Sequence, residues 1–277
     1  MQIRTPAVAG MFYPGEKNKL SKLIDDCFLH AFGPGEKPPK TNGGKIFGVI
    51  CPHAGYVYSG PIACNSIYSI SSVLPELFII IGPNHWGIGR NVATMKDCKW
   101  ETPLGKVEVD SESAEEISRL SQNIEPDFFS HTREHSLEVQ IPILQKTFSD
   151  FKILPISLIN QSKEIAEDVG IAISKIAKKK NTIIIGSSDF THYESNEFAH
   201  EQDMALIEPI LEMDVDRFYD VLQERRVTAC GYGAIAATMV ACKELGATKG
   251  KLLRYATSGD VTGDTSSVVG YGSIVFT

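Results

Sequence analysis

Residues 79–87 read IIIGPNHWG, a short aliphatic run that stops at a Gly-Pro pair and is followed by His85. Continuous aliphatic runs are typical of strands buried on both faces of a parallel sheet, and such sheets bind ligands beyond the carboxyl ends of their strands. Two other segments share this design: VICPHAGY (49–56), with His53, and IIIGSSDFTHY (183–193), with Asp189 and His192. These three segments predict three strands that end at one site.

Strands and helices alternate from residue 45 onward, which favours an α/β fold with a largely parallel central sheet and helices on both faces. Aliphatic runs predict strands over 45–51, 76–82, 152–159, 182–187, 251–256 and 268–276, and short antiparallel strands within 91–109. Helical spacing of apolar residues predicts helices over 16–32, 61–71, 111–122, 162–178, 197–211, 215–225 and 233–245. Residues 128–148 should be helical over much of their length, with a kink or a late start at Pro142.

The composition limits the class of protein. With 277 residues, 43% of them hydrophobic, the chain can fill a sizeable core, and we expect one domain over 1–277. The Gly- and Pro-rich stretch 33–44 then reads as a surface loop. A net charge of −7 argues against nucleic-acid and anionic-membrane partners, which require clustered Lys and Arg. No signal peptide or membrane span is recognisable, so a soluble, cytoplasmic protein is expected.

Three residues are candidate metal ligands. A lone histidine in a loop is more often structural, but His53 and His85 both follow predicted strands, and imidazole is the commonest metal ligand. Cys230 is the candidate third ligand, because a predicted helix follows it directly and the positive end of a helix stabilises a thiolate. Its alternative is a small buried hydrophobe, which we expect of Cys242.

Asp189 and His192 are the candidate acid/base residues. They lie three residues apart, close enough to share a hydrogen bond or to face one substrate. His192 could exchange a proton near neutral pH, with Asp189 orienting it. Capping of the following turn is the alternative for Asp189.

Two further polar segments are expected to be secondary. His131 and His135 are one helical turn apart, which is also a spacing for a metal pair. We interpret His135, with Glu134 and Glu138, as surrounding the metal ligands instead. Residues 258–267 lack the spacing of a calcium loop and predict a surface or pocket-edge turn.

Six segments resemble the Memo family, named for a mediator of cell motility, in order and over nearly the whole chain. They are TPAVAGMFYPG, CPHAGYVYSGPIA, IGPNHWG, EHSLEVQIP, SSDFTHY and ACGYGAI. That family is similar in fold to the class III extradiol ring-cleaving dioxygenases, whose non-haem iron is held by two histidines and a glutamate. The resemblance implies a dioxygenase-like domain with His53 and His85 at the histidine positions and Cys230 at the third, while Asp189 and His192 line the pocket.

The cysteine in place of a carboxylate departs from the dioxygenases. A thiolate favours softer ions such as copper(I) or zinc. We therefore expect a metal-binding, redox-active oxidoreductase that holds iron or copper, with zinc as an alternative. A second hypothesis is a non-enzymatic module that binds a small molecule, a peptide or a protein partner in the retained pocket. A third makes Cys230 a hydrolytic nucleophile activated by His192 and Asp189.

Overall fold

The computed structural model describes residues 2–39 and 44–277. The predicted loop at 33–44 is therefore described only in part, since residues 40–43 lie outside the described residues. Among the helices of the described ranges, none is both long and apolar enough to cross a membrane.

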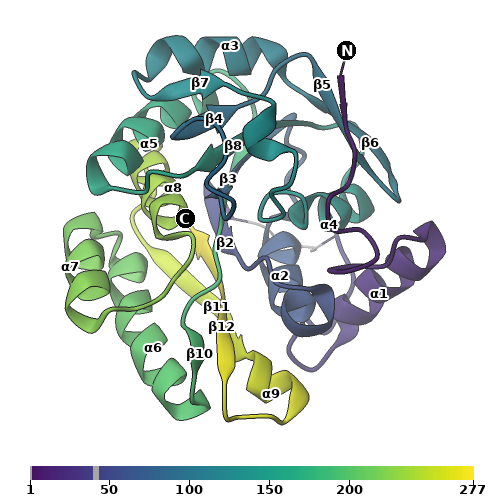
Figure 1. Cartoon of the computed structure of the whole chain (residues 1–277), viewed down its shortest axis with the longest axis vertical. Coiled ribbons are helices and arrows are strands. Elements are labelled where there is room, and N and C mark those ends of the chain that lie inside the picture. Colours follow the sequence, from purple (N-terminus) through teal and green to yellow (C-terminus); the bar gives the residue numbers. More distant parts are fainter. Residues whose placement is uncertain (1, 40–43) are drawn as a thin grey trace.

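The described strands form one twelve-stranded sheet. They are β1 (Gln2–Arg4), β2 (Gly48–Cys51), β3 (Leu77–Pro83), β4 (Val92–Thr94), β5 (Cys98–Thr102), β6 (Gly105–Val109), β7 (Ile124–Pro126), β8 (Lys152–Leu158), β9 (Thr182–Ser187), β10 (His192–Glu194), β11 (Gly250–Thr257) and β12 (Val268–Phe276). The order is β1-β5-β6-β8-β3-β9-β2-β12-β10, with β11 paired to β12 and β4 paired to β7 and β8 (Figure 1).

The central strands β6, β8, β3, β9 and β2 are all parallel, which confirms the predicted largely parallel sheet. β3, β9 and β2 are direct neighbours, with Ile81 opposite Gly186 and Cys51 opposite Ser187 near their ends. Because parallel strands end at the same edge, the loops that follow these three strands start side by side.

Helices cover both faces of the sheet, as predicted. They are α1 (Lys17–Leu29), α2 (Tyr56–Ile70), α3 (Ser111–Leu120), α4 (Gln140–Thr147), α5 (Lys163–Ala177), α6 (Asn196–Glu212), α7 (Val215–Arg225), α8 (Tyr232–Glu244) and α9 (Ser258–Thr262). Side chains of β3 alternate between two cores. Ile79 and Ile81 belong to the core that also contains side chains of α3, α5, α6, α7 and α8, whereas Phe78 and Ile80 belong to the core with α1, α2 and α4. Figure 1 shows α5 and α8 on one side of the sheet and α1, α2 and α4 on the other.

Two helices differ from their predicted extents. α2 starts at Tyr56 and not near Pro61, because the Tyr56 N–H donates to the Phe12 carbonyl and the Ser59 hydroxyl donates to the Ala54 carbonyl. Proline therefore lies inside this helix rather than in its first turn.

The second is α4, which covers only Gln140–Thr147 and is preceded by a short 3-10 turn over Phe129–His131. Pro142 lies in its first turn, which is the predicted late start. Much of 128–148 is not helical, because the buried carboxylates of Glu134 and Glu138 bond other segments of the chain.

The short elements β1, β7, β10 and α9 were not predicted. Each of these strands depends on pairing with a strand distant in sequence. Of the strands predicted within 91–109, β5 and β6 form the expected antiparallel hairpin, whereas β4 pairs with β7 and β8. α9 is set by a capping box between Thr257 and Asp260.

The N-terminal segment after β1 is fixed by one buried carboxylate. Glu138 pairs with the Arg4 guanidinium and accepts hydrogen bonds from the Ala7 and Val8 N–H groups and from the Tyr13 hydroxyl. These contacts hold residues 5–15 against the sheet edge at which the site-bearing strands end.

Candidate metal centre

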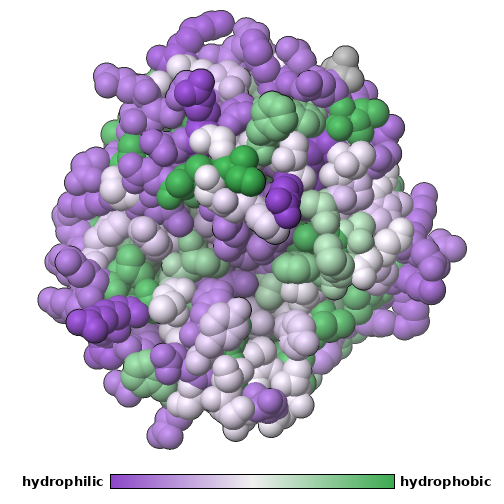
Figure 2. Space-filling model, in the orientation of Figure 1, coloured by the Kyte–Doolittle hydropathy of each residue, from purple (hydrophilic) through white to green (hydrophobic). Residues whose placement is uncertain are grey.

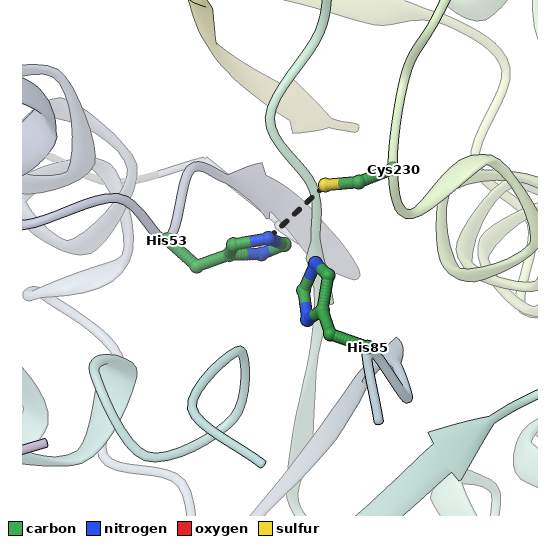
Figure 3. Close-up of side chains that lie close together, drawn as sticks. All are labelled: His53, His85 and Cys230. Carbon is green, nitrogen blue, oxygen red and sulfur yellow. Dashed lines mark hydrogen bonds between the residues drawn. The ribbon is translucent and has the colours of Figure 1, made fainter. Parts of the chain in front are cut away.

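The structure brings His53, His85 and Cys230 together from three distant segments (Figure 3). His53 follows β2, His85 follows β3, and Cys230 lies two residues before α8. One nitrogen of each imidazole and the sulfur all lie within 4.8 Å of one another. The Cys230 Sγ is 3.1 Å from the His53 Nε2. The strand ends predict that His53 and His85 meet, and Cys230 joins them from the segment before α8.

Glu134 fixes the tautomer of His85. Its carboxylate accepts a hydrogen bond of 2.8 Å from the His85 Nδ1, and it also accepts the His85 backbone N–H at 2.6 Å. Burial alone would raise the pKa of Glu134, but the hydrogen bond from His85 brings it to about 2. A carboxylate with so low a pKa is ionised and can only accept. The proton is therefore on Nδ1, and Nε2 keeps its lone pair for a ligand.

Ser187 does the same for His53. Its hydroxyl proton is donated to the Ser136 carbonyl, and its oxygen accepts from the Gln140 amide, so it can only accept from the His53 Nδ1, which lies 3.0 Å away. The Nε2 of His53 therefore carries the lone pair. Burial, with the neighbouring imidazoles of His85 and His135, lowers the pKa of His53 well below its usual value, so the ring is neutral.

Cys230 is a protonated thiol in the metal-free protein. Burial and the charge of Asp189 raise its pKa, so the α8 N-terminus does not by itself create a thiolate. The thiol faces the lone pair of the His53 Nε2 (Figure 3). A coordinated thiol is deprotonated outright, so an ion bound here would displace this proton. The buried Cys242 is the small hydrophobe that the sequence predicts.

A second group of three candidate ligands shares His85 and adds Glu134 and His135. The His135 ring stacks on His85 at 4.5 Å between centroids, and burial lowers its pKa to about 4. Glu134 is fully used, since its two oxygens accept from His85 and from the His135 and Ser136 N–H groups. Glu134 therefore orients His85. This agrees with the prediction that it lies around the candidate metal ligands and is not one of them.

The spacing of His131 and His135 does not make a metal pair. His131 is completely buried and packs edge-on against Trp100, 5.8 Å between ring centroids. Its backbone carbonyl accepts from Arg4. The segment between the two histidines is not a continuous helix, so the helical spacing on which that alternative rested is absent.

The sequence allows Asp189 and His192 either to share a hydrogen bond or to face one substrate. The structure has the second arrangement, because both residues line one cavity. Asp189 accepts the His53 backbone N–H at 2.8 Å, and burial raises its pKa to about 6. The partner that orients His192 is Thr228, whose carbonyl accepts from the His192 Nδ1 at 2.9 Å. Because a carbonyl only accepts, the His192 Nε2 is the basic nitrogen.

These residues line a cavity of about 980 Å³. Phe12 and Met11 of the N-terminal segment, Tyr58 of α2 and Tyr193 of β10 also line it. Figure 2 shows the face of the molecule that is seen in Figure 1. The margin of that face is mostly hydrophilic, while hydrophobic and intermediate residues gather toward its centre. A volume of this size is in the range of small-molecule sites.

Sequence reasoning missed the groups that hold the histidine rings. They are Ser187 at the end of β9, Gln140 at the start of α4 and Thr228 between α7 and α8. Only Ser187 carried a signal, its place at the end of a site-bearing strand. A serine, a glutamine or a backbone carbonyl has no distinctive spacing, so the other two were not recognisable.

Comparisons with known proteins agree with this architecture. The family model for Memo-like proteins matches residues 4–275. A MEMO1 family protein of Nitrosopumilus maritimus is 66% identical over 275 residues, and the match covers 99% of this chain and 99% of that protein. One of Methanopyrus kandleri is 46% identical over 279 residues, with 99% of this chain and 98% of its own length covered.

A solved structure shares the fold. The crystal structure of an uncharacterised protein from Escherichia coli K12 matches with a TM-score of 0.59 and 10% identity, covering 84% of this chain and 100% of that one. At this identity the likeness concerns the fold alone. On the family match and the close relatives, this chain belongs to the Memo family, as its six segments predict.

Proposed function

We propose that this protein is a redox-active metal protein of oxidoreductase type, in which His53, His85 and Cys230 hold one iron or copper ion. The observation that carries the proposal is the orientation of the two imidazoles. Each has its Nδ1 proton committed to a buried acceptor, so that both Nε2 lone pairs are free, and one nitrogen of each ring lies within 4.8 Å of the thiol sulfur. Such outer hydrogen bonds are what metal-ligating histidines commonly have.

The donor set supports this group of metals. Two neutral imidazoles and one thiolate suit iron, copper and zinc, and they disfavour magnesium and calcium, which take oxygen ligands. Three protein ligands leave room for a substrate or water on the ion. When bound, iron or copper would supply one-electron chemistry toward dioxygen or a small substrate.

The surrounding residues would handle protons. His192 presents a basic Nε2 on the cavity side that it shares with the candidate ligands, and its tautomer is held by Thr228. Asp189 has a pKa of about 6, raised by burial, so it can be protonated or ionised near neutral pH. These two groups are suited to general acid/base roles.

Metal content tests the proposal. Protein reconstituted with iron(II) or copper(I) under argon and desalted is expected to retain one ion per chain by elemental analysis. His85→Ala should retain less than a tenth of that amount. His30→Ala, which removes an exposed imidazole after α1, should behave like the wild type. Trace binding in the wild type, or full binding in His85→Ala, would overturn the proposal.

A further inference from the structure

His192 lies in a strained turn. The residue after it, Tyr193, has a φ of 62°, in the left-handed region that residues other than glycine rarely adopt, and its side chain is 77% exposed. The register between β10 and β12 also shifts between His192 and Glu194. Because the exposed Tyr193 side chain has little packing to offset this strain, contacts elsewhere must hold the turn.

Thr191, the residue before His192, supplies such contacts through Asp203 of α6. One oxygen of this carboxylate, Oδ1, accepts the Thr191 N–H at 3.0 Å and the Thr191 hydroxyl at 2.6 Å. The Thr191 carbonyl accepts the Gly270 N–H at 2.9 Å, so all three polar groups of Thr191 are bonded. The backbone is therefore fixed directly before His192.

Asp203 is itself held from several sides. It is completely buried, and its Oδ2 accepts the Tyr255 hydroxyl at 2.6 Å. A Cβ on Gly270 would lie only 1.9 Å from this oxygen, so a glycine at this position lets the carboxylate lie against β12. Asp203 does not line the cavity. It can therefore act on the contents of the cavity only through the residues that it bonds.

We propose that Asp203 is a positioning residue for His192, because its two hydrogen bonds with Thr191 keep the strained turn in place and aim the imidazole into the cavity. His192 then reaches Thr228, whose hydroxyl oxygen accepts the His192 N–H and whose carbonyl accepts the Nδ1 proton. Without the anchor at Thr191 the turn can relax, and the imidazole loses that carbonyl. This inference deepens the proposed function and rests on it for the proton-handling role of His192.

The tautomer of His192 reports its position. Long-range proton–nitrogen NMR spectra of the metal-free protein with labelled histidine distinguish the two tautomers of each ring, and His192→Gln assigns the signal. In the wild type, the Nδ1–H tautomer should exceed the other by about fivefold, the ratio that one net hydrogen bond to Thr228 sustains. Asp203→Ala should lower this ratio by about threefold or more, because the ring loses its acceptor.

Two further variants separate positioning from charge. Asp203→Asn removes the charge but keeps an oxygen that can accept from Thr191, so it should retain the wild-type ratio. Thr191→Val keeps the shape and the backbone N–H but loses the hydroxyl, so it should lower the ratio in the same direction as Asp203→Ala. Thr191→Val decides alone if Asp203→Ala does not fold.

A matched control removes a carboxylate elsewhere. Asp168 of α5 is partly buried and accepts from the Ser121 hydroxyl and the Asn123 amide. Asp168→Ala loses the same kind of contact away from the turn, and it should keep the wild-type ratio at His192. The His85 signal is an internal control, because that ring is held from another segment, and it should be the same in every variant.

Three results would overturn the inference. The first is an unchanged ratio at His192 in folded Asp203→Ala or, if that variant does not fold, in Thr191→Val. The second is a loss in Asp203→Asn as large as that in the variant that lacks the hydrogen bond. The third is an equal change of tautomer at His85, which would show a general loosening of the fold.

The inference and the proposed function fail separately. The tautomer ratio is measured without metal, whereas elemental analysis of the reconstituted wild type tests the metal centre. A ratio that falls in Asp203→Ala, while the wild type retains only traces of metal, would contradict the metal centre alone. One retained ion per wild-type chain, with an unchanged ratio in Asp203→Ala, would contradict the role of Asp203 alone.

Discussion

At the scale of single residues, two histidine tautomers decide what the centre can bind. Glu134 accepts from the His85 Nδ1 and leaves Nε2 for an ion. Glu134→Gln keeps the shape but removes the charge, and its amide can present a donor to the ring. We expect metal affinity to fall about 10- to 100-fold. Competition with a chromophoric chelator measures it.

The control for this variant is Glu224→Gln, an exposed carboxylate at the end of α7. Its metal affinity should equal that of the wild type. Wild-type affinity in Glu134→Gln, with the fold intact by circular dichroism, would contradict the assigned role of this carboxylate.

His131 should make stability depend on pH. Burial, with the charge of Arg4, lowers its pKa to about 3, whereas the unfolded imidazole titrates near pH 6.5. Below about pH 6.5 the unfolded chain therefore binds a proton that the folded protein does not, and stability falls as the pH falls toward 3. At pH 5 this loss amounts to about 2 kcal/mol.

Urea unfolding at pH 7.5 and pH 5.0 measures this contribution. The free energy of unfolding of His131→Leu should drop by about 2 kcal/mol less than that of the wild type between the two values. Equal drops in the two proteins would show that His131 is not held neutral by burial.

At the scale of elements, the N-terminal segment depends on a buried ion pair. Arg4 and Glu138 are both almost completely buried, and Glu138 also accepts from the Ala7 and Val8 N–H groups. Glu138→Gln leaves a buried guanidinium without its carboxylate, which should lower the free energy of unfolding by about 3 kcal/mol or more.

The matched variant is Glu108→Gln, which breaks the exposed pair with Lys152. It should cost less than about 1 kcal/mol, because exposed ion pairs contribute little. Urea unfolding compares the two substitutions. A similar small cost for both would contradict the role given to Glu138 in fixing residues 5–15.

The elements show where prediction from sequence ends. β3 and β9 were predicted almost to the residue, because continuous aliphatic runs bounded by turn residues are strong local signals. β1 and β10 were not predicted, since three-residue strands exist only through partners distant in the chain. The start of α2 was misplaced because it depends on the Phe12 carbonyl, which the sequence around Tyr56 does not reveal.

At the scale of the whole molecule, the candidate metal centre depends on the order of the strands in the sheet. His53 and His85 follow the parallel strands β2 and β3, which both pair with β9. This part of the site was predictable from the strand pattern. The roles of Gln140 and Thr228 were not, because they arise from contacts that only the assembled sheet creates.

Metal binding should stabilise the folded protein, because the unfolded chain has no preformed site. Free metal at a hundred times its dissociation constant is expected to raise the free energy of unfolding by about 2.7 kcal/mol. Cys230→Ser should lose most of this increment. Cys242→Ala, which alters a buried thiol at the far end of α8, should keep the increment despite a lower starting stability. An undiminished increment in Cys230→Ser would remove Cys230 from the centre.

The central claim is that three groups from distant segments bind one ion. Anomalous diffraction from crystals of reconstituted protein, recorded above and below the absorption edge of the added iron or copper, tests it most directly. The account predicts one strong difference peak within bonding reach of the Nε2 atoms of His53 and His85 and of the Cys230 Sγ. A peak elsewhere in the molecule, or a fully reconstituted crystal without a peak between these atoms, would contradict it.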